Sequence, residues 1–381
     1  MRGKTDKKKQ REIPANRIAA FGIRSLPPED GSAGADKFAL ELYPRLVKKG
    51  YVVTVYNRNY EGTNTLGIYN GVHVIGLKTV RQSGFDTIVH SMKATWHIIA
   101  HNSADIVHIH NGGNSIWALP LRLCGKKVFI SQDGIDWKRE KWPWYGKIFL
   151  YCSAFIAAHV AHEVIFDNIF AQKYYSSKFK KSFKYIPYGS EVVTPKHSTG
   201  ILKKLGLTPG EYFLFVGRFI PDKGVHYLIR AFDQISTKKK LVLVGGSPNP
   251  SEYEKSLRET RNDRIIFPGY IYGESILELM RHAYIYIQPS DVEGQSPVIL
   301  TVMGLGTPLL CSDIPENLFV IQDQALTFKQ GNIQSLKEQL EYAILHPKIL
   351  KGLAVSGRTH ILKNYSWDKT VHEHIETFFG A

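Results

Sequence analysis

The chain has 381 residues, too many for one ordinary hydrophobic core, so two or three domains of about 150 residues each are expected. Hydrophobic residues make up 43% of the chain and charged residues 22%, which excludes a disordered protein. The net formal charge of +15 favours anionic partners, and nucleic acid ranks below phosphorylated small molecules and an anionic membrane because no zinc-finger or RNA-binding motif is found.

The first half of the chain predicts strands alternating with helices after a basic tail at residues 1–16, which lacks the apolar run of a secretory signal. Residues 35–50 predict a helix. The longest apolar run, 148–161, is shorter than the ~20 residues that span a bilayer, so a buried helix is favoured over a membrane-touching one. The expected strands are short, β-rich runs: 17–24, 51–57, 105–110, 126–131 and 162–168.

The same alternation restarts after a polar stretch at about 190–210. A helix is expected over 223–235, and the expected strands are 212–218, 240–246, 264–270, 284–290 and 307–313. Continuous apolar strands are typical of a parallel sheet covered on both faces. The fold class expected is therefore α/β, with two doubly wound, Rossmann-like domains at 17–195 and 196–363. Ligands of such domains bind beyond the carboxyl ends of the strands.

Three cysteines, Cys124, Cys152 and Cys311, are few and widely spaced, which argues against a disulfide framework or a structural metal site and for a reducing compartment.

The first motif is VGRFIPDKGVHYL, in which Arg218 ends a strand and Lys223 with Gly224 opens a helix. Two cations beside the N–H groups of a helix start are suited to binding a diphosphate. Alternatively, Lys223 is a solvated lysine and Arg218 a structural salt-bridge partner. Because lysine at a helix start opposes the helix dipole, phosphate binding is favoured.

The second motif is PSDVEGQSPVILTVMGLGTPLLCSD, where Glu293 follows a strand. Gly294, Gln295 and Ser296 form a turn whose amides can face a ligand, and Ser296 or Pro297 starts a helix. Glu293 can accept hydrogen bonds from sugar hydroxyls there, although an exposed loop acid is the alternative.

Together these motifs resemble the retaining glycosyltransferases of family 4, which have the GT-B architecture. The carboxyl-terminal half supplies the ordered set Gly217, Arg218, Lys223, Gly224, Pro289, Ser290, Glu293, Gly294, Met303, Gly306 and Pro308, continued by SDIPEN at 312–317. The amino-terminal half is similar to a polysaccharide-associated, rhamnosyltransferase-like subgroup at 33–58, 133–142 and 186–191. The resemblance implies two domains facing across a cleft, with the last segment, 364–381, crossing back to the first domain.

The resemblance also implies the roles of individual residues. Asp133, Arg218, Lys223 and Glu293 are expected to be catalytic, with Asp133 standing where many relatives have histidine. Gly34 and His110 are expected at the cleft, although histidines of a HIH strand, His108 and His110, are more often polar strand-end residues. The donor is expected to contact Gly217, Gly294, Gln295, Ser296, Pro297 and Thr301.

Thr301 replaces the second glutamate of the family pattern, which holds the ribose of the nucleotide. A neutral hydroxyl bond in place of a charge-assisted one predicts roughly tenfold weaker donor binding, or a little more.

The function expected is sugar transfer from a nucleotide-diphosphate sugar to a lipid-linked saccharide in surface polysaccharide biosynthesis, without a metal or other cofactor and without nucleic acid. The protein is expected to be cytoplasmic and peripheral at the anionic inner face of the plasma membrane. Residues 138–151 are its candidate membrane-facing element or, equally, an interdomain loop. The alternatives are a non-catalytic family member that binds saccharide or stabilises a transferase, and, less favoured, a sugar-nucleotide epimerase.

Overall fold

The computed structural model describes residues 16–28, 34–60, 64–81, 85–139, 142–190, 198, 200–246 and 251–380. The expected basic tail lies outside these residues except for Asn16, and the expected domain boundary at 195 also lies outside them and stays a prediction. The chain divides into two compact units. The first contains Met1–Pro27, Ala39–Ser131 and Asp136–Val164, and the second contains Pro28–Phe38, Gln132–Ile135 and Ile165–Ala381.

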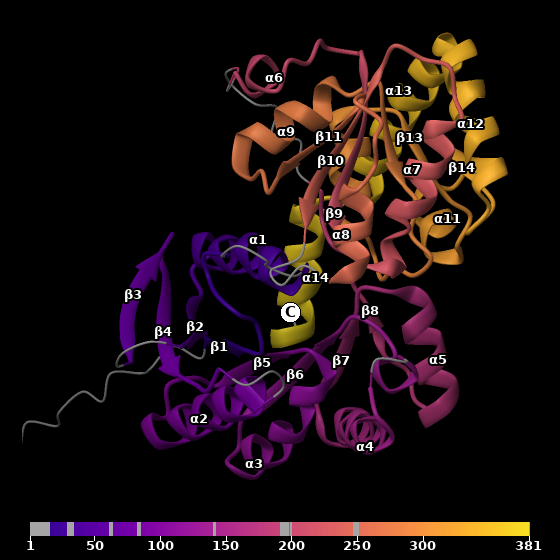
Figure 1. The fold of residues 1–381 in the computed structure, drawn as a ribbon. Helices are drawn as coiled ribbons and strands as arrows, with labels where there is room; N and C mark the ends of the chain where they lie inside the picture. The colour runs from indigo at the N-terminus through magenta and orange to yellow at the C-terminus, as the bar shows by residue number, and fades with distance from the viewer. Residues whose placement is uncertain are drawn as a thin grey trace, which may run out of the picture. The chain divides into compact units, whose positions relative to one another are not determined.

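The first sheet has the strand order β3-β4-β2-β1-β5-β6-β7-β8 (Figure 1). Its strands are β1 (Arg17–Phe21), β2 (Val52–Asn59), β3 (Thr65–Tyr69), β4 (Val72–Lys78), β5 (Ile106–His110), β6 (Lys127–Gln132), β7 (Glu163–Phe166) and β8 (Lys184–Tyr185). The central strands β1, β5 and β6 are parallel and deeply buried, as their continuous apolar runs predict.

The pair β3 and β4 is a difference from the expected all-parallel sheet. These strands are antiparallel, and the turn between them is Asn70-Gly71, both with positive φ, 46° and 82°. Such a turn matches the twist of a hairpin, and Asn-Gly is its strongest sequence signal. The sequence of β3, TLGIY, lacks the continuous apolar run from which the other strands were predicted, and its side chains are largely exposed.

The second sheet has the order β11-β10-β9-β12-β13-β14. Its strands are β9 (Tyr212–Arg218), β10 (Lys240–Gly246), β11 (Ile265–Gly269), β12 (Ile285–Gln288), β13 (Leu309–Ser312) and β14 (Leu326–Phe328). All its pairs are parallel, and numbered from its own first strand the order is 3-2-1-4-5-6, that of a Rossmann domain. The expectation of two doubly wound, Rossmann-like sheets is thus confirmed.

Helices alternate with strands through most of the chain. Their bounds are α1 (Gly34–Lys48), α2 (Phe85–His101), α3 (Ala118–Leu123), α4 (Trp144–Val160), α5 (Ile169–Phe179), α6 (Ile201–Lys204), α7 (Val225–Asp233), α8 (Glu252–Arg258), α9 (Gly273–His282), α10 (Pro297–Leu305), α11 (Pro315–Ile321), α12 (Ile333–Leu345), α13 (Pro347–Asn364) and α14 (Trp367–Phe379). The 3-10 helices are η1 (Gly112–Trp117), η2 (Asp136–Lys138) and η3 (Pro221–Lys223).

Helix α7 is shorter than the expected 223–235. Residues Pro221–Lys223 form the turn η3, and Gly224 follows in the left-handed region at φ 64°, so the α-helix begins at Val225. Its apolar residues, spaced three and four apart, are buried against the sheet in the core of the second unit. Lys223 therefore lies in the loop before the helix and not in its first turn.

Helix α4 differs from the buried helix expected over 148–161. One side of it packs inside the first unit through residues such as Leu150, Ala154 and Ala157. The opposite side is exposed, with Ile148 at 55% and Phe155 at 50% of their full accessibility. Among the described residues, no helix is both long and apolar enough to cross a bilayer.

Candidate functional site

The candidate site lies at the carboxyl edge of the second sheet, where the strand order reverses. Strands β9 and β12 are neighbours there, although two strands separate them in the sequence. Because they are parallel, their following loops leave the sheet at the same edge, and this switch point is where doubly wound sheets bind ligands. The loop after β9 contains Lys223, and the loop after β12 contains Glu293.

Two backbone contacts join these loops. The amide of Asp291 donates to the carbonyl oxygen of Asp222 at 2.9 Å. A side chain at Gly224 would place its Cβ 1.9 Å from the carbonyl oxygen of Pro289, and φ at Gly224 is 64°. Only glycine combines this conformation with this clearance, so Gly224 fixes the approach of the two loops.

Lys223 and Glu293 form an ion pair across the switch point. Lys223 Nζ donates to Glu293 Oε1 at 2.6 Å, and only 7% of the Glu293 side chain is exposed. Gln288 Nε2 and Ser290 Oγ donate to the same oxygen at 2.5 and 2.6 Å. Within the described part of the chain no hydrogen bond reaches Oε2. Glu293 therefore keeps one oxygen that can accept from a ligand.

A second layer of hydrogen bonds orients this carboxylate. The buried Tyr286 hydroxyl donates to Gln288 Oε1 at 2.8 Å, which turns the amide nitrogen of Gln288 toward Glu293. The carbonyl oxygen of Ser290 accepts from Ser312 Oγ at 2.5 Å. Gln288 and Ser290 were not predicted as site residues. Their signal is a pair of polar residues closing an otherwise apolar strand at its carboxyl end.

Arg218 ends β9 with an exposed side chain. No hydrogen bond or ion pair of its guanidinium is found among the described residues, so the structural salt bridge considered as an alternative is not found. Beside it, Gly217 lies close to the end of β10, since a Cβ at Gly245 would lie 1.9 Å from the Gly217 carbonyl oxygen. The arrangement leaves a cation at the sheet edge that can pair with an anionic ligand.

The turn from Gly294 to Pro297 leads into helix α10 and contains the side chain of Gln295. Ser296 precedes α10 and Pro297 is its first residue, as expected. The side chain of Gln295 is buried, and its Oε1 accepts from the amide of Tyr188 at 2.5 Å. The oxygen of the Gln295 side chain is thus used inside the second unit, whereas its buried Nε2 has no hydrogen-bond partner among the described residues.

Thr301 lies in the second turn of α10. Its hydroxyl donates to the carbonyl oxygen of Pro297 at 2.9 Å, one helical turn earlier. Its side chain is half-buried. The hydroxyl proton is therefore already engaged with the helix, and a ligand contact would use the oxygen lone pairs.

Asp133 and Gly34 gather around a buried tyrosine that was not predicted as a site residue. The carbonyl oxygen of Asp133 lies 3.4 Å from the position of a Cβ at Gly294, and the Tyr188 hydroxyl lies 3.8 Å from that of a Cβ at Gly34. Burial raises the pKa of Tyr188 well above its usual value, and the nearby carboxylates of Asp167 and Asp133 raise it further. Tyr188 is therefore a neutral phenol at any physiological pH.

His110 is the last residue of β5. It is 2% exposed in the first unit, and its Nε2 lies 2.5 Å from the hydroxyl of Tyr43, which is 3.0 Å from His108 Nδ1. His108 Nε2 lies 2.7 Å from Ser131 Oγ. Both histidines belong to a buried hydrogen-bonded network, and the expected place of His110 at the cleft stays a prediction.

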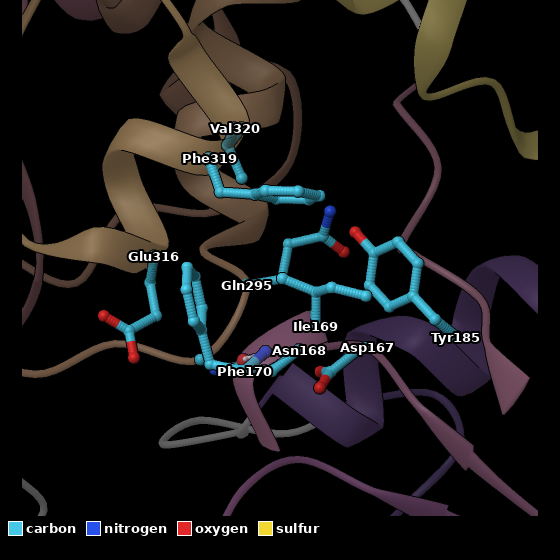
Figure 2. A pocket seen from close by; sticks show the side chains of 10 residues that line it. Asp167, Asn168, Ile169, Phe170, Tyr185, Gln295, Glu316, Phe319 and Val320 are labelled. Atoms are coloured by element: carbon cyan, nitrogen blue, oxygen red, sulfur yellow. Dashed lines mark hydrogen bonds between the residues drawn. The ribbon is translucent and has the colours of Figure 1, made fainter. Parts of the chain in front are cut away.

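A small hollow lies beside the Gly294 turn in the second unit (Figure 2). Its aromatic lining comes from Phe170, Tyr185 and Phe319, and Glu316 stands at one side. Burial raises the pKa of Glu316 above its usual value. Arg218, Lys223 and Glu293 are not among its lining residues, so the hollow adjoins the charged site without containing it.

Two stretches of the chain match known protein families. Residues 200–359 match the model of the family described as "Glycosyl transferases group 1", and residues 109–191 match a domain of unknown function, DUF1972. The first stretch is a glycosyltransferase group 1 domain, and it contains Arg218, Lys223, Glu293 and Thr301.

Similar proteins include O-antigen chain mannosyltransferase B of Escherichia coli, 24% identical over 55% of this chain and 55% of the relative. The capsular polysaccharide biosynthesis glycosyltransferase CapM of Staphylococcus aureus is 20% identical over 44% of this chain and 45% of the relative. The chain spans about half the length of these curated relatives.

Among solved structures, Anabaena HepE in complex with UDP and glucose matches 96% of this chain and 100% of that chain, with a TM-score of 0.79 and 16% identity. A likeness at this identity shows the fold, which is that of the GT-B glycosyltransferases. The expected fold class is confirmed in this respect.

Proposed function

We propose that the protein is a retaining glycosyltransferase that moves a sugar from a nucleotide-diphosphate sugar to a saccharide acceptor in surface polysaccharide biosynthesis. The observation that carries this proposal is the Lys223–Glu293 pair at the switch point of a glycosyltransferase group 1 domain. The names of the O-antigen and capsular relatives and the UDP bound to HepE support the choice of donor and pathway class.

Lys223 and Arg218 would hold the leaving diphosphate. When the bond between the anomeric carbon and the phosphate oxygen breaks, negative charge builds on that oxygen, and fixed cations stabilise it. Lys223 has three ammonium protons and Glu293 occupies one, so the others can reach phosphate oxygens. The ion pair also holds Lys223 in place before the donor arrives.

Glu293 would bind the transferred sugar through Oε2, which can accept from a sugar hydroxyl. Asp133, whose backbone adjoins Gly294, would stabilise positive charge at the anomeric carbon or accept from another hydroxyl. The backbone of Gly294 to Pro297 and the hydroxyl oxygen of Thr301 would complete the donor site, together with Gly217.

The finer assignments belong to the same proposal. We assign the protein to family 4 and its rhamnosyltransferase-like subgroup, with domains at 17–195 and 196–363 facing across a cleft that Gly34 lines, and 364–381 crossing back. The acceptor is a lipid-linked saccharide, and the protein works from the cytoplasm at the anionic inner face of the plasma membrane. Two protein cations take the place of a metal, so no cofactor is needed.

Kinetic assays with purified protein and a panel of dTDP-, UDP- and GDP-sugars test the proposal. Lys223→Ala and Arg218→Ala should each lower kcat/KM by about 10²- to 10³-fold, the usual cost of losing one transition-state partner. Lys255→Ala is the matched control, since Lys255 is an exposed lysine on α8 of the same unit. Unchanged transfer in both site variants would refute the diphosphate assignment.

A non-catalytic, saccharide-binding or transferase-stabilising role is the second candidate, favoured by the engaged hydroxyl of Thr301. Calorimetry with nucleoside diphosphates separates the two. A transferase should bind the nucleoside diphosphate, and its Lys223→Ala variant should not. A non-catalytic protein should bind no nucleoside diphosphate.

A further inference from the structure

Helix α4 presents an exposed apolar stripe in the first unit. Trp144, Ile148 and Phe155 recur at helical spacing along it, and the side chain of Trp144 is 73% exposed. Trp and Tyr side chains on such a surface are typical of the boundary between a bilayer and water.

Two neighbouring helices extend this surface. On α2, Met92 and Trp96 lie one turn apart and are exposed, and on α3 the side chain of Leu123 is 80% exposed. Helix α3 contacts both α2 and α4, and the three lie side by side along one face of the first sheet (Figure 1). Contiguous apolar surfaces of this kind mark interaction sites.

The charges on the three helices have one sign. Lys93, Arg122 and Lys147 belong to them, and the single carboxylate in their sequences is Asp86. Asp86 is buried and paired with Arg58 at 2.8 Å, so the three helices expose no acidic side chain. An apolar surface that carries cations alone complements an anionic lipid layer.

We infer that the outer face of α2, α3 and α4, called here the docking face, binds an anionic lipid bilayer. The inference rests on the proposed action at a membrane and places the contact on three helices, beyond the 138–151 segment expected from the sequence. Lysine is depleted in protein–protein interfaces, whereas Lys and Arg beside exposed Trp, Phe and Leu are typical of helices that bind an anionic lipid surface. The charge pattern of the docking face therefore favours an anionic lipid bilayer as its partner over another protein.

Flotation of the full chain with vesicles tests the inference. Vesicles of phosphatidylcholine with phosphatidylglycerol should carry the protein at low salt, and vesicles of phosphatidylcholine alone should carry much less. The affinity of the double variant Leu123→Ser/Ile148→Ser for the anionic vesicles should be lower by about tenfold or more. The affinity of Lys93→Gln/Lys147→Gln for the same vesicles should be lower by roughly fivefold or more.

The matched control is Leu345→Ser/Val355→Ser, which changes two similarly exposed apolar residues on α12 and α13 of the second unit. It should bind like the unchanged protein. Quenching of the tryptophan fluorescence by brominated lipids adds a readout of position, and Trp96→Phe/Trp144→Phe should lose this quenching if these two of the six tryptophans enter the bilayer.

Three results would overturn the inference: no binding to anionic vesicles, equal loss in the control, or a dimer in sedimentation that only Leu123→Ser/Ile148→Ser abolishes. Calorimetry with nucleoside diphosphates on the same proteins distinguishes failure of the lipid-binding inference from failure of the proposed transferase function. The docking-face variants should bind nucleotide normally, and absent nucleotide binding would refute the transferase and leave the vesicle result unaffected.

Discussion

At the scale of single residues, hydrogen bonds from within the chain hold the carboxylate of Glu293 in one orientation. Three donors converge on one oxygen of Glu293, and Tyr286 fixes the amide that supplies one of them. The carboxylate thus cannot rotate without losing several hydrogen bonds, each worth about 1 kcal/mol or more. Electrostatic sites of this kind pay no reorganisation when charge develops.

Thr301→Glu tests how the nucleotide is held. The threonine hydroxyl is engaged with the Pro297 carbonyl, whereas a glutamate could reach a ribose hydroxyl with a charged acceptor. We expect nucleotide to bind about tenfold more tightly, measured by calorimetry with nucleoside diphosphates. Thr301→Val is the control and should change affinity little, and unchanged affinity in Thr301→Glu would mean that other groups hold the ribose.

The sequence could predict part of the site and not the rest. Arg218 ends an apolar strand, and Lys223 and Glu293 lie in the loops that follow two such strands, which leave a parallel sheet at the same edge. Nothing in the sequence shows that Gln295 turns inward to Tyr188 or that His110 faces Tyr43, because the direction of a side chain depends on packing between distant segments.

At the scale of the elements, α14 contains a buried histidine. His374 is fully buried beside the rings of Phe38 and Phe378, and its Nδ1 lies 2.7 Å from the carbonyl oxygen of Thr370. Burial lowers the pKa of His374 from 6.5 to about 4. The folded protein therefore keeps this imidazole neutral where the unfolded chain protonates it.

This shift predicts a loss of stability in acid. The contribution of the neutral His374 side chain to the free energy of unfolding is fully present above pH 6.5. It is lost as the pH falls from 6.5 to about 4, because only the unfolded chain takes up the proton in that window. The loss reaches about 3 kcal/mol. In thermal unfolding between pH 7 and pH 4.5, His374→Leu should weaken the dependence of the melting temperature on pH.

His372→Leu is the matched control, because His372 lies on the same helix with 71% of its side chain exposed. It should leave the pH dependence nearly as it is. An unaltered pH dependence in His374→Leu would show that His374 does not control acid stability.

Element prediction succeeded where one physical signal dominated. Strands β9 and β10 have the predicted bounds, because a parallel central strand is apolar throughout. The hairpin of β3 and β4 was not predicted from the sequence, although Asn70-Gly71 is a strong sequence signal for a hairpin turn. Helix α4 was predicted to be buried from its apolar composition, which cannot distinguish a core from an exposed docking surface.

At the scale of the whole molecule, the two proposed activities are separable. The cations and carboxylate of the donor site lie in the second unit, and the docking face lies in the first. The overall charge of +15 attracts both nucleotide and lipid, and salt screens both attractions. Mutations can therefore remove membrane binding or nucleotide binding one at a time.

Nucleotide binding should stabilise the whole chain in a way that identifies the base. A ligand that binds only the folded state at 100 times its Kd adds about 2.7 kcal/mol, which raises the melting temperature by a few degrees. We expect one nucleoside diphosphate in a UDP, GDP, ADP and dTDP screen to give the largest rise, and Lys223→Ala to abolish it. Since Arg218 and Lys223 would neutralise the diphosphate, the rise should persist in EDTA. A rise that needs added Mg²⁺ would show that a metal, and not these two cations alone, holds the diphosphate.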